Sequence, residues 1–144
     1  MRILALDVGT KTIGVAVSDP LGITAQGITT IERIGIKKDT NKVVDFVKEY
    51  DCSEVVLGLP INLDGSDSIQ TEKVYEFRTK LENKFRSTGL VNVKIEWQDE
   101  RFTTVIAERV LIEADVSRKN RKKVIDKQAA VIILQSYLDR MSNV

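Results

Sequence analysis

Acidic residues from three separate parts of the chain stand where a metal site could form. Asp7 ends a short apolar run, Asp99 and Glu100 follow a predicted strand, and Asp126 lies at the start of a predicted helix. A carboxylate at the end of a buried strand costs free energy unless something pairs with it. Carboxylates just beyond the carboxyl end of a sheet strand occupy the edge where α/β proteins usually build their sites.

Each acid also has a purely structural interpretation. Asp7, followed by Gly9, fits a common turn, and either acid of the 99–100 pair could stabilise a helix N-terminus by about 0.3–1 kcal/mol. Asp126 could be a solvated helix residue paired with a nearby lysine. The small side chains of Ala129 and Ala130, three and four residues later, would instead leave room above Asp126 for an ion or a phosphate.

The combination of acids without histidine indicates one kind of chemistry. The chain has no histidine, which excludes His-based catalysis and His-ligated zinc. Carboxylate oxygens suit Mg²⁺ or Mn²⁺. Two such ions about 3.5–4 Å apart can activate water and stabilise the leaving oxygen of a phosphodiester. We therefore expect metal-assisted hydrolysis that needs no general base.

A cationic run precedes Asp126. Five residues of this segment are basic: Arg118, Lys119, Arg121, Lys122 and Lys123. Positive charge is unfavourable at a helix N-terminus, and a phosphate backbone docked there would relieve the repulsion. A solubilising loop is the alternative. The formal net charge of the whole chain is only +1, so an argument for nucleic acid must rest on this local charge.

Length and composition fit one domain over residues 1–144, with 42% hydrophobic and 30% charged residues. No run approaches the roughly 20 apolar residues of a membrane helix, and the apolar start is too short for a signal peptide. Cys52 is the only cysteine, so no internal disulfide can form. We expect a cytoplasmic protein in a reducing compartment, without a membrane partner.

Hydrophobic periodicity predicts the element order β-β-β-α-β-α-β-α-α. The strands are expected at Ile3–Leu6, Ile13–Val17, Gly27–Glu32, Glu54–Leu59 and Val91–Trp97, the last half-exposed near a sheet edge. The helical stripes cover residues 43–50, 74–85, 106–114 and 125–136. Short turns join the first three strands into an antiparallel meander. The alternating β-α-β pairs then require a mixed sheet with helices on both faces.

Several helix ends and faces can also be predicted. The first helix has cap candidates at Asp39, Thr40 and Asn41, and Gly89 suits the end of the second. The third has Thr103 or Thr104 as its cap. The buried face of the last helix is expected to contain Ile125, Ala129, Ile132, Ile133 and Ser136.

Four segments resemble the motifs of one family, YqgF, also called RuvX, in the same order and over nearly the whole chain. The segments are Leu6–Ala16, Val55–Pro60 with Asn62 and Asp64–Ser66, Asp99–Thr104, and Asp126–Ala130 continuing through Ile133–Leu138. The resemblance implies a ribonuclease H-like fold: a mixed five-stranded sheet flanked by helices on both faces.

The resemblance also implies a function. It predicts a bacterial cytoplasmic endonuclease, dependent on Mg²⁺ or Mn²⁺, that processes the 5′ end of pre-16S rRNA in ribosome precursors. Carried over to this chain, the catalytic and metal-binding acids are Asp7, Glu100 and Asp126, with Glu100 preferred to Asp99. A Holliday-junction resolvase acting on branched DNA is an alternative, as is a non-catalytic RNA-binding assembly factor. The protein is expected to be a monomer or a weak homodimer.

Further residues near the acids are candidates for nucleic-acid contact. Lys11 and Arg101 could hold phosphate, together with Arg118, Arg121, Lys122 and Lys123 from the cationic run. Salt bridges to the acids are the alternative for Lys11 and Arg101. Phe102 and Trp97 are expected to pack rather than to stack on bases. Gly58 is a departure from the ribonuclease H-like pattern, which usually has a second carboxylate at the end of the fourth strand.

Overall fold

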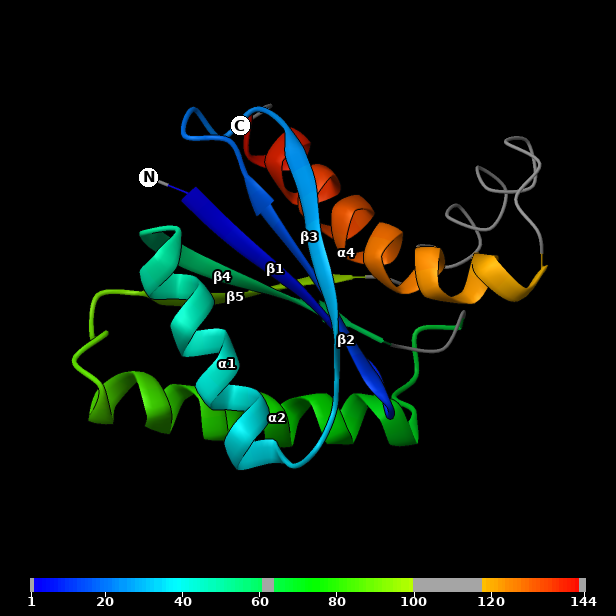
Figure 1. The fold of residues 1–144 in the computed structure, drawn as a ribbon, viewed down its shortest axis with the longest axis horizontal. Coiled ribbons are helices and arrows are strands. Elements are labelled where there is room, and N and C mark those ends of the chain that lie inside the picture. The colour runs from blue at the N-terminus through cyan, green and yellow to red at the C-terminus, as the bar shows by residue number, and fades with distance from the viewer. Residues whose placement is uncertain (1, 61–63, 100–117, 143–144) are drawn as a thin grey trace.

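A computed structural model describes residues 2–60, 64–99 and 118–142, and the side chains of these residues except 118–127. Eight elements follow one another in the order expected from the sequence (Figure 1). They are β1 (Arg2–Val8), β2 (Thr12–Ser18), β3 (Ala25–Glu32), α1 (Ile36–Glu49), β4 (Cys52–Leu59), α2 (Ile69–Ser87), β5 (Lys94–Asp99) and α4 (Arg118–Ser142). The helix predicted over 106–114, with its cap at Thr103 or Thr104, lies outside the described residues.

The strands form one mixed five-stranded sheet in the order β3-β2-β1-β4-β5. β1 pairs antiparallel with β2, and β2 with β3, which confirms the predicted meander. β4 pairs parallel with both β1 and β5. The carboxyl ends of β1, β4 and β5 therefore lie at one edge of the sheet, and residues distant in sequence are brought together there.

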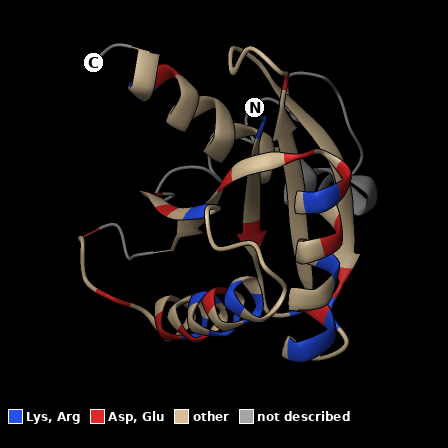
Figure 2. Cartoon of the chain, turned by 90° about the vertical axis from the view of Figure 1, so that its left-hand side faces the viewer, with Lys and Arg blue, Asp and Glu red and all other residues tan. Residues whose placement is uncertain are grey.

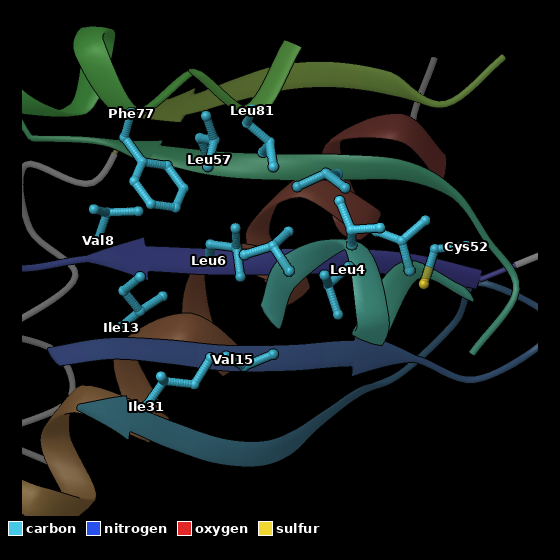
Figure 3. Close-up of a cluster of buried hydrophobic side chains, with 14 of the residues drawn as sticks. Leu4, Leu6, Val8, Ile13, Val15, Ile31, Cys52, Leu57, Phe77 and Leu81 are labelled. Carbon is cyan, nitrogen blue, oxygen red and sulfur yellow. The ribbon is translucent and has the colours of Figure 1, made fainter. Parts of the chain in front are cut away.

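Helices cover both faces of the sheet, as predicted. α1 and α2 lie against one face, where the larger core includes Leu4, Leu6, Leu57, Phe77 and Leu81, all fully buried (Figure 3). α4 covers the opposite face, with a smaller core. There the sheet presents Ala5, Ala16 and Val56 to Ala130, Ile133 and Leu134. Because these sheet side chains are small, α4 can lie close to the strands.

β5 is an edge strand, as its alternating sequence predicts. Ile95 and Trp97 are half-buried against the larger core, whereas Lys94 and Glu96 are exposed. The strand begins at Lys94 rather than at Val91, because a turn in which the Val93 amide donates to the Leu90 carbonyl precedes it.

The start of α1 differs from the prediction. Gly35, with φ 149°, is its N-cap, so all three candidate caps, Asp39, Thr40 and Asn41, lie inside the helix. Asp39 is buried and accepts hydrogen bonds from Arg33 and from the Ile34 amide. The Asp39 carboxylate thus bonds to residues that precede the helix, although the local sequence suggests that it caps the helix.

α2 has well-defined ends. Ser68 caps its N-terminus in a reciprocal arrangement with Thr71. Gly89, with φ 80°, ends the helix as predicted, and the Leu90 amide donates to the Phe85 carbonyl.

α4 starts earlier than predicted, at Arg118, so Asp126 lies two turns inside the helix rather than at its start. Its buried residues are Ala129, Ala130, Ile133, Leu134, Tyr137 and Leu138. Ser136 is exposed, which contradicts its predicted place on the buried face. No helix among the described residues is both long and apolar enough to cross a bilayer.

We predict that Tyr137→Phe lowers the free energy of unfolding by about 1.5–3 kcal/mol, the usual range for a hydrogen bond to a charged group. The buried Tyr137 hydroxyl donates to Glu54 Oε1. Burial, and after it this hydrogen bond, raises the pKa of Tyr137 far above its usual value, so the phenol remains a donor. Urea unfolding measures the change. Tyr75→Phe, at an exposed tyrosine, is the control, and equal losses in the two variants would contradict the prediction.

Cys52 is expected to resist alkylation in the folded protein. It is a buried free thiol, and burial raises its pKa from 9.0 to about 11. At pH 8 the reactive thiolate is therefore about 100-fold scarcer than for an unperturbed cysteine. Iodoacetamide labelling followed by mass spectrometry should show slow reaction in buffer and fast reaction in guanidinium. Equal rates in both conditions would refute this expectation.

Candidate metal and nucleic-acid site at the carboxyl edge of the sheet

Asp7 lies in a row of residues that crosses four strands near the carboxyl edge. It pairs with Gly14 of β2 on one side. On the other side, β1 and β4 are in parallel register up to the residue before Asp7, so Gly58 comes next to it. Gly58 in turn pairs with Gln98 of β5. We call Gly14, Asp7, Gly58 and Gln98 the carboxyl-edge row.

The members of this row belong to the face that α4 covers. Ala5 and Val56 lie two residues before Asp7 and Gly58, and both pack against α4. Because strand side chains alternate between faces, the half-buried Asp7 is on the same side. The neighbouring positions, Gly14 and Gly58, carry no side chains. On both sides of Asp7 along the row, the sheet therefore presents only backbone atoms.

Asp99 belongs to the opposite face. It pairs with Leu59 at the end of β5 and alternates in step with Trp97, which packs on the α2 side. Tyr75 meets the Trp97 ring edge-on at 5.4 Å, and the Arg78 guanidinium lies 4.9 Å from the ring centre. Trp97 is thus a packing residue, as predicted, and Asp99 does not share the face of Asp7.

The turn that follows Asp7 is fixed by backbone hydrogen bonds. The Gly9 amide donates to the Thr12 carbonyl over 2.9 Å, and a Cβ on Gly9 would come within 3.0 Å of that oxygen. Arg33 holds the turn from outside, since its Nη1 donates to the Gly9 carbonyl and its amide to the Lys11 carbonyl. Lys11 itself is exposed at the turn, where it can meet a ligand from solvent.

A buried ion pair orients Arg33. Its Nε lies 3.0 Å from Asp39 Oδ2, and the Asp39 side chain is fully buried. The guanidinium also lies 5.5 Å from the centre of the Phe77 ring. The sequence analysis missed this arrangement, because it interpreted Asp39 as a candidate helix cap. The only signal in the sequence was the position of the acid Asp39 before the apolar stripe of the first predicted helix.

The start of α2 is fastened to the same edge. Gln70 Nε2 donates to the Val8 carbonyl over 2.7 Å, just beyond Asp7. The hydroxyls of Ser68 and Thr71 both bond to the Pro60 carbonyl. The ends of β1 and β4 are thereby held by one helix, which restricts movement of the backbone around Asp7.

The cationic run forms the first turns of α4. The backbone of Arg118, Arg121, Lys122 and Lys123 is helical, and the first turn contains no acidic residue. Their side chains lie outside the described set, as do Glu100, Arg101 and Phe102 entirely. By contrast, α1 and α2 carry charges of both signs along their lengths (Figure 2).

No group of three acidic, cysteine or histidine residues close enough to hold a metal is found among the described residues. That set contains the side chain of Asp7 but not those of Glu100 and Asp126. The predicted three-acid centre consequently stays a prediction.

Solved structures with the same fold include two Holliday-junction resolvases. A Fowlpox virus resolvase, solved with substrate Holliday-junction DNA, matches 98% of this chain and 99% of its own with a TM-score of 0.58 at 19% identity. RuvC of T. thermophilus, in complex with a Holliday-junction substrate, matches 98% of this chain and 96% of its own with a TM-score of 0.59 at 14% identity. The fold is ribonuclease H-like, as expected.

The chain belongs to the RuvX family, whose model, described as "Holliday junction resolvase", matches residues 1–140. A relative from Clostridium kluyveri is 51% identical over 142 residues, 99% of each chain. Another, from Clostridioides difficile, is 54% identical over 138 residues, 96% of this chain and 94% of its own. Both are named "Putative pre-16S rRNA nuclease". The family resemblance drawn from the four motifs is thus confirmed.

We predict that Arg33→Met lowers the free energy of unfolding by about 3–5 kcal/mol, because it leaves the buried Asp39 carboxylate without its counter-charge. Arg86→Met is the matched control. Its ion pair with Glu82 spans 3.9 Å between exposed side chains and is worth about 0–1 kcal/mol. Chemical unfolding of both variants measures the difference, and similar losses would show that Arg33 does not hold the turn through Asp39.

Proposed function

We propose that this protein is a metal-dependent nuclease that processes the 5′ end of pre-16S rRNA. The names of its relatives and its family membership support a nuclease. The observation that carries the proposal is the place of Asp7. Its carboxylate lies at the carboxyl edge of the sheet, between two glycines, on the face covered by the helix that contains Asp126.

Glu100 and Asp126 complete the proposed set of acids. Glu100 follows Asp99 directly in the chain, and β5 lies two strands from β1 at the same edge. Two strand spacings amount to about 10 Å. Asp99 lies on the α2 side, opposite to Asp7, and this disfavours Asp99 as a ligand.

The position of Asp126 along α4 also supports the proposal that the three acids lie close to one another. Tyr137 bonds to Glu54 near the start of β4, and α4 runs back toward the carboxyl edge from there (Figure 1). Asp126 precedes Tyr137 by three helical turns, about 16 Å along the axis. The same distance along β4 from Glu54 reaches about Leu59. This estimate favours a place for Asp126 near the carboxyl-edge row.

The residues present fit a hard divalent cation such as Mg²⁺ or Mn²⁺. The row supplies a carboxylate from Asp7 and a buried amide oxygen, Gln98 Oε1, that has no hydrogen-bond partner. Oxygen donors of these two types are ligands that such ions take. A bound ion would lower the pKa of a water and stabilise charge on the phosphate. Asp7, Glu100 and Asp126 would hold it, and the fixed turn after Asp7 would orient the carboxylate.

The cationic residues would hold the nucleic acid. Arg118, Arg121, Lys122 and Lys123 lie on the helix turns that precede Asp126, so a strand bound to them would pass the acids. Lys11 would contact phosphate from the turn after Asp7, and Arg101 from the segment that follows Glu100. Neutralising phosphates along the strand releases counterions, which makes such binding dependent on salt.

Resolution of branched DNA is the second candidate. The family model's description and the structural similarity to two resolvases favour it. Such an activity cuts symmetric junctions and would need a symmetric dimer. A monomer that cleaves RNA would separate the proposed function from this alternative.

We predict that Asp7→Asn lowers the rate of Mn²⁺-dependent cleavage at least 100-fold, because it removes a charged oxygen from the ion's ligand set. The assay uses purified protein with a pre-16S rRNA fragment and, separately, a four-way DNA junction. Asp19→Asn is the matched control, since Asp19 caps the exposed β2–β3 turn through bonds from the Ile23 and Thr24 amides.

The substrate that is cut decides between the two nuclease functions. Cleavage of neither substrate, with Asp7→Asn indistinguishable from wild type, would contradict both. If RNA binding is then lost on neutralising Arg121, Lys122 and Lys123, without any dependence on metal, the protein is an assembly factor that binds RNA without cutting it.

A further inference from the structure

Gln98 has a buried oxygen that the protein leaves without a partner. Its Oε1 is inaccessible to solvent and accepts no hydrogen bond. It is the only such side-chain atom found in the described part of the chain. Buried acceptors without donors are disfavoured, because the atom has lost its hydrogen bonds to water. In native structures, a bound water or ion is a common explanation for such an atom.

The location of Gln98 suggests what that partner is. Gln98 pairs with Gly58, and Gly58 lies beside Asp7, so one residue without a side chain separates the amide from the carboxylate. Both strands alternate so that these two side chains belong to the α4 face. Across the intervening glycine, the Cα atoms of Asp7 and Gln98 are two strand spacings apart, about 10 Å. Gly58 adds no side chain to the space between them.

We propose that Gln98 Oε1 is an oxygen donor to the divalent ion held by Asp7, either directly or through a water that the ion carries. This inference rests on the proposed function and adds a neutral ligand to its three acids. Amide oxygens bind hard cations as carboxylates do, but they add no negative charge. A neutral donor keeps the site from repelling the phosphate that it must accept.

A role in packing makes the opposite prediction for stability. If Gln98 served only to fill space, its amide would be bonded, and an apolar replacement would weaken the fold. An orphaned acceptor is unfavourable in the protein without metal, so Gln98→Met should leave the metal-free unfolding temperature unchanged or raise it. The two interpretations can therefore be separated without measuring activity.

The test compares Mn²⁺ binding and thermal unfolding of the full chain. We expect Gln98→Met to weaken Mn²⁺ binding about 10-fold, as other changes near metal ligands do, and to shrink the rise in unfolding temperature caused by Mn²⁺. Gln98→Glu should tighten Mn²⁺ binding, because it adds a charge at the same reach. Gln26→Met is the matched control, since Gln26 is exposed on β3, the other edge strand.

The outcomes distinguish this inference from the function on which it rests. If the wild-type protein binds no Mn²⁺, both the proposed function and the role of Gln98 are contradicted. If Asp7→Asn abolishes Mn²⁺ binding but both Gln98 variants bind Mn²⁺ as strongly as the wild type, only the role of Gln98 is overturned. If the Gln98→Met protein is less stable than the wild type without metal, and its Mn²⁺ affinity is unchanged, Gln98 has a packing role.

Discussion

The parallel pairing of β4 with β1 and β5 is the constraint on which the site depends. Parallel strands end at the same edge, so this pairing brings Asp7, Gly58 and Gln98 into one row although they are far apart in the sequence. The same pairing buries β1 and β4 between two layers of helices, which requires the apolar runs seen in both strands. One arrangement thus produces both the core and the position of the carboxylate.

The two faces of the sheet contribute differently to the site. On the α1 and α2 side, the core is large, and the buried pair of Arg33 with Asp39 fixes the turn after Asp7. Gln70 ties α2 to the end of β1 from that side. On the α4 side, the sheet presents small side chains and then, near the carboxyl edge, a row in which glycines alternate with the polar side chains of Asp7 and Gln98. The contacts of Arg33 and Gln70 that fix the end of β1 are therefore made on the face opposite to the polar side chains of the row.

Much of the fold could be predicted from the sequence alone. The five apolar strands, the helical stripes and the meander follow from short-range periodicity, which depends only on neighbouring residues. Helix starts were less predictable: α1 begins at Ile36, and its residue Asp39 pairs with Arg33 instead of capping the helix, while α4 begins two turns before Asp126. The exposed Ser136 shows the same limit, since the orientation of α4 is set by the sheet on which it packs.

By itself, the sequence determined the family and indicated the kind of chemistry and the acids that could perform it. The carboxylates and the absence of histidine indicate metal-assisted hydrolysis, and four motifs in order match the RuvX family. Only the tertiary structure decided which face each side chain occupies, that Asp99 and Asp7 belong to opposite faces, and that Gln98 stands beside Gly58. Those relations depend on strand register, which long-range pairing sets and local sequence does not encode.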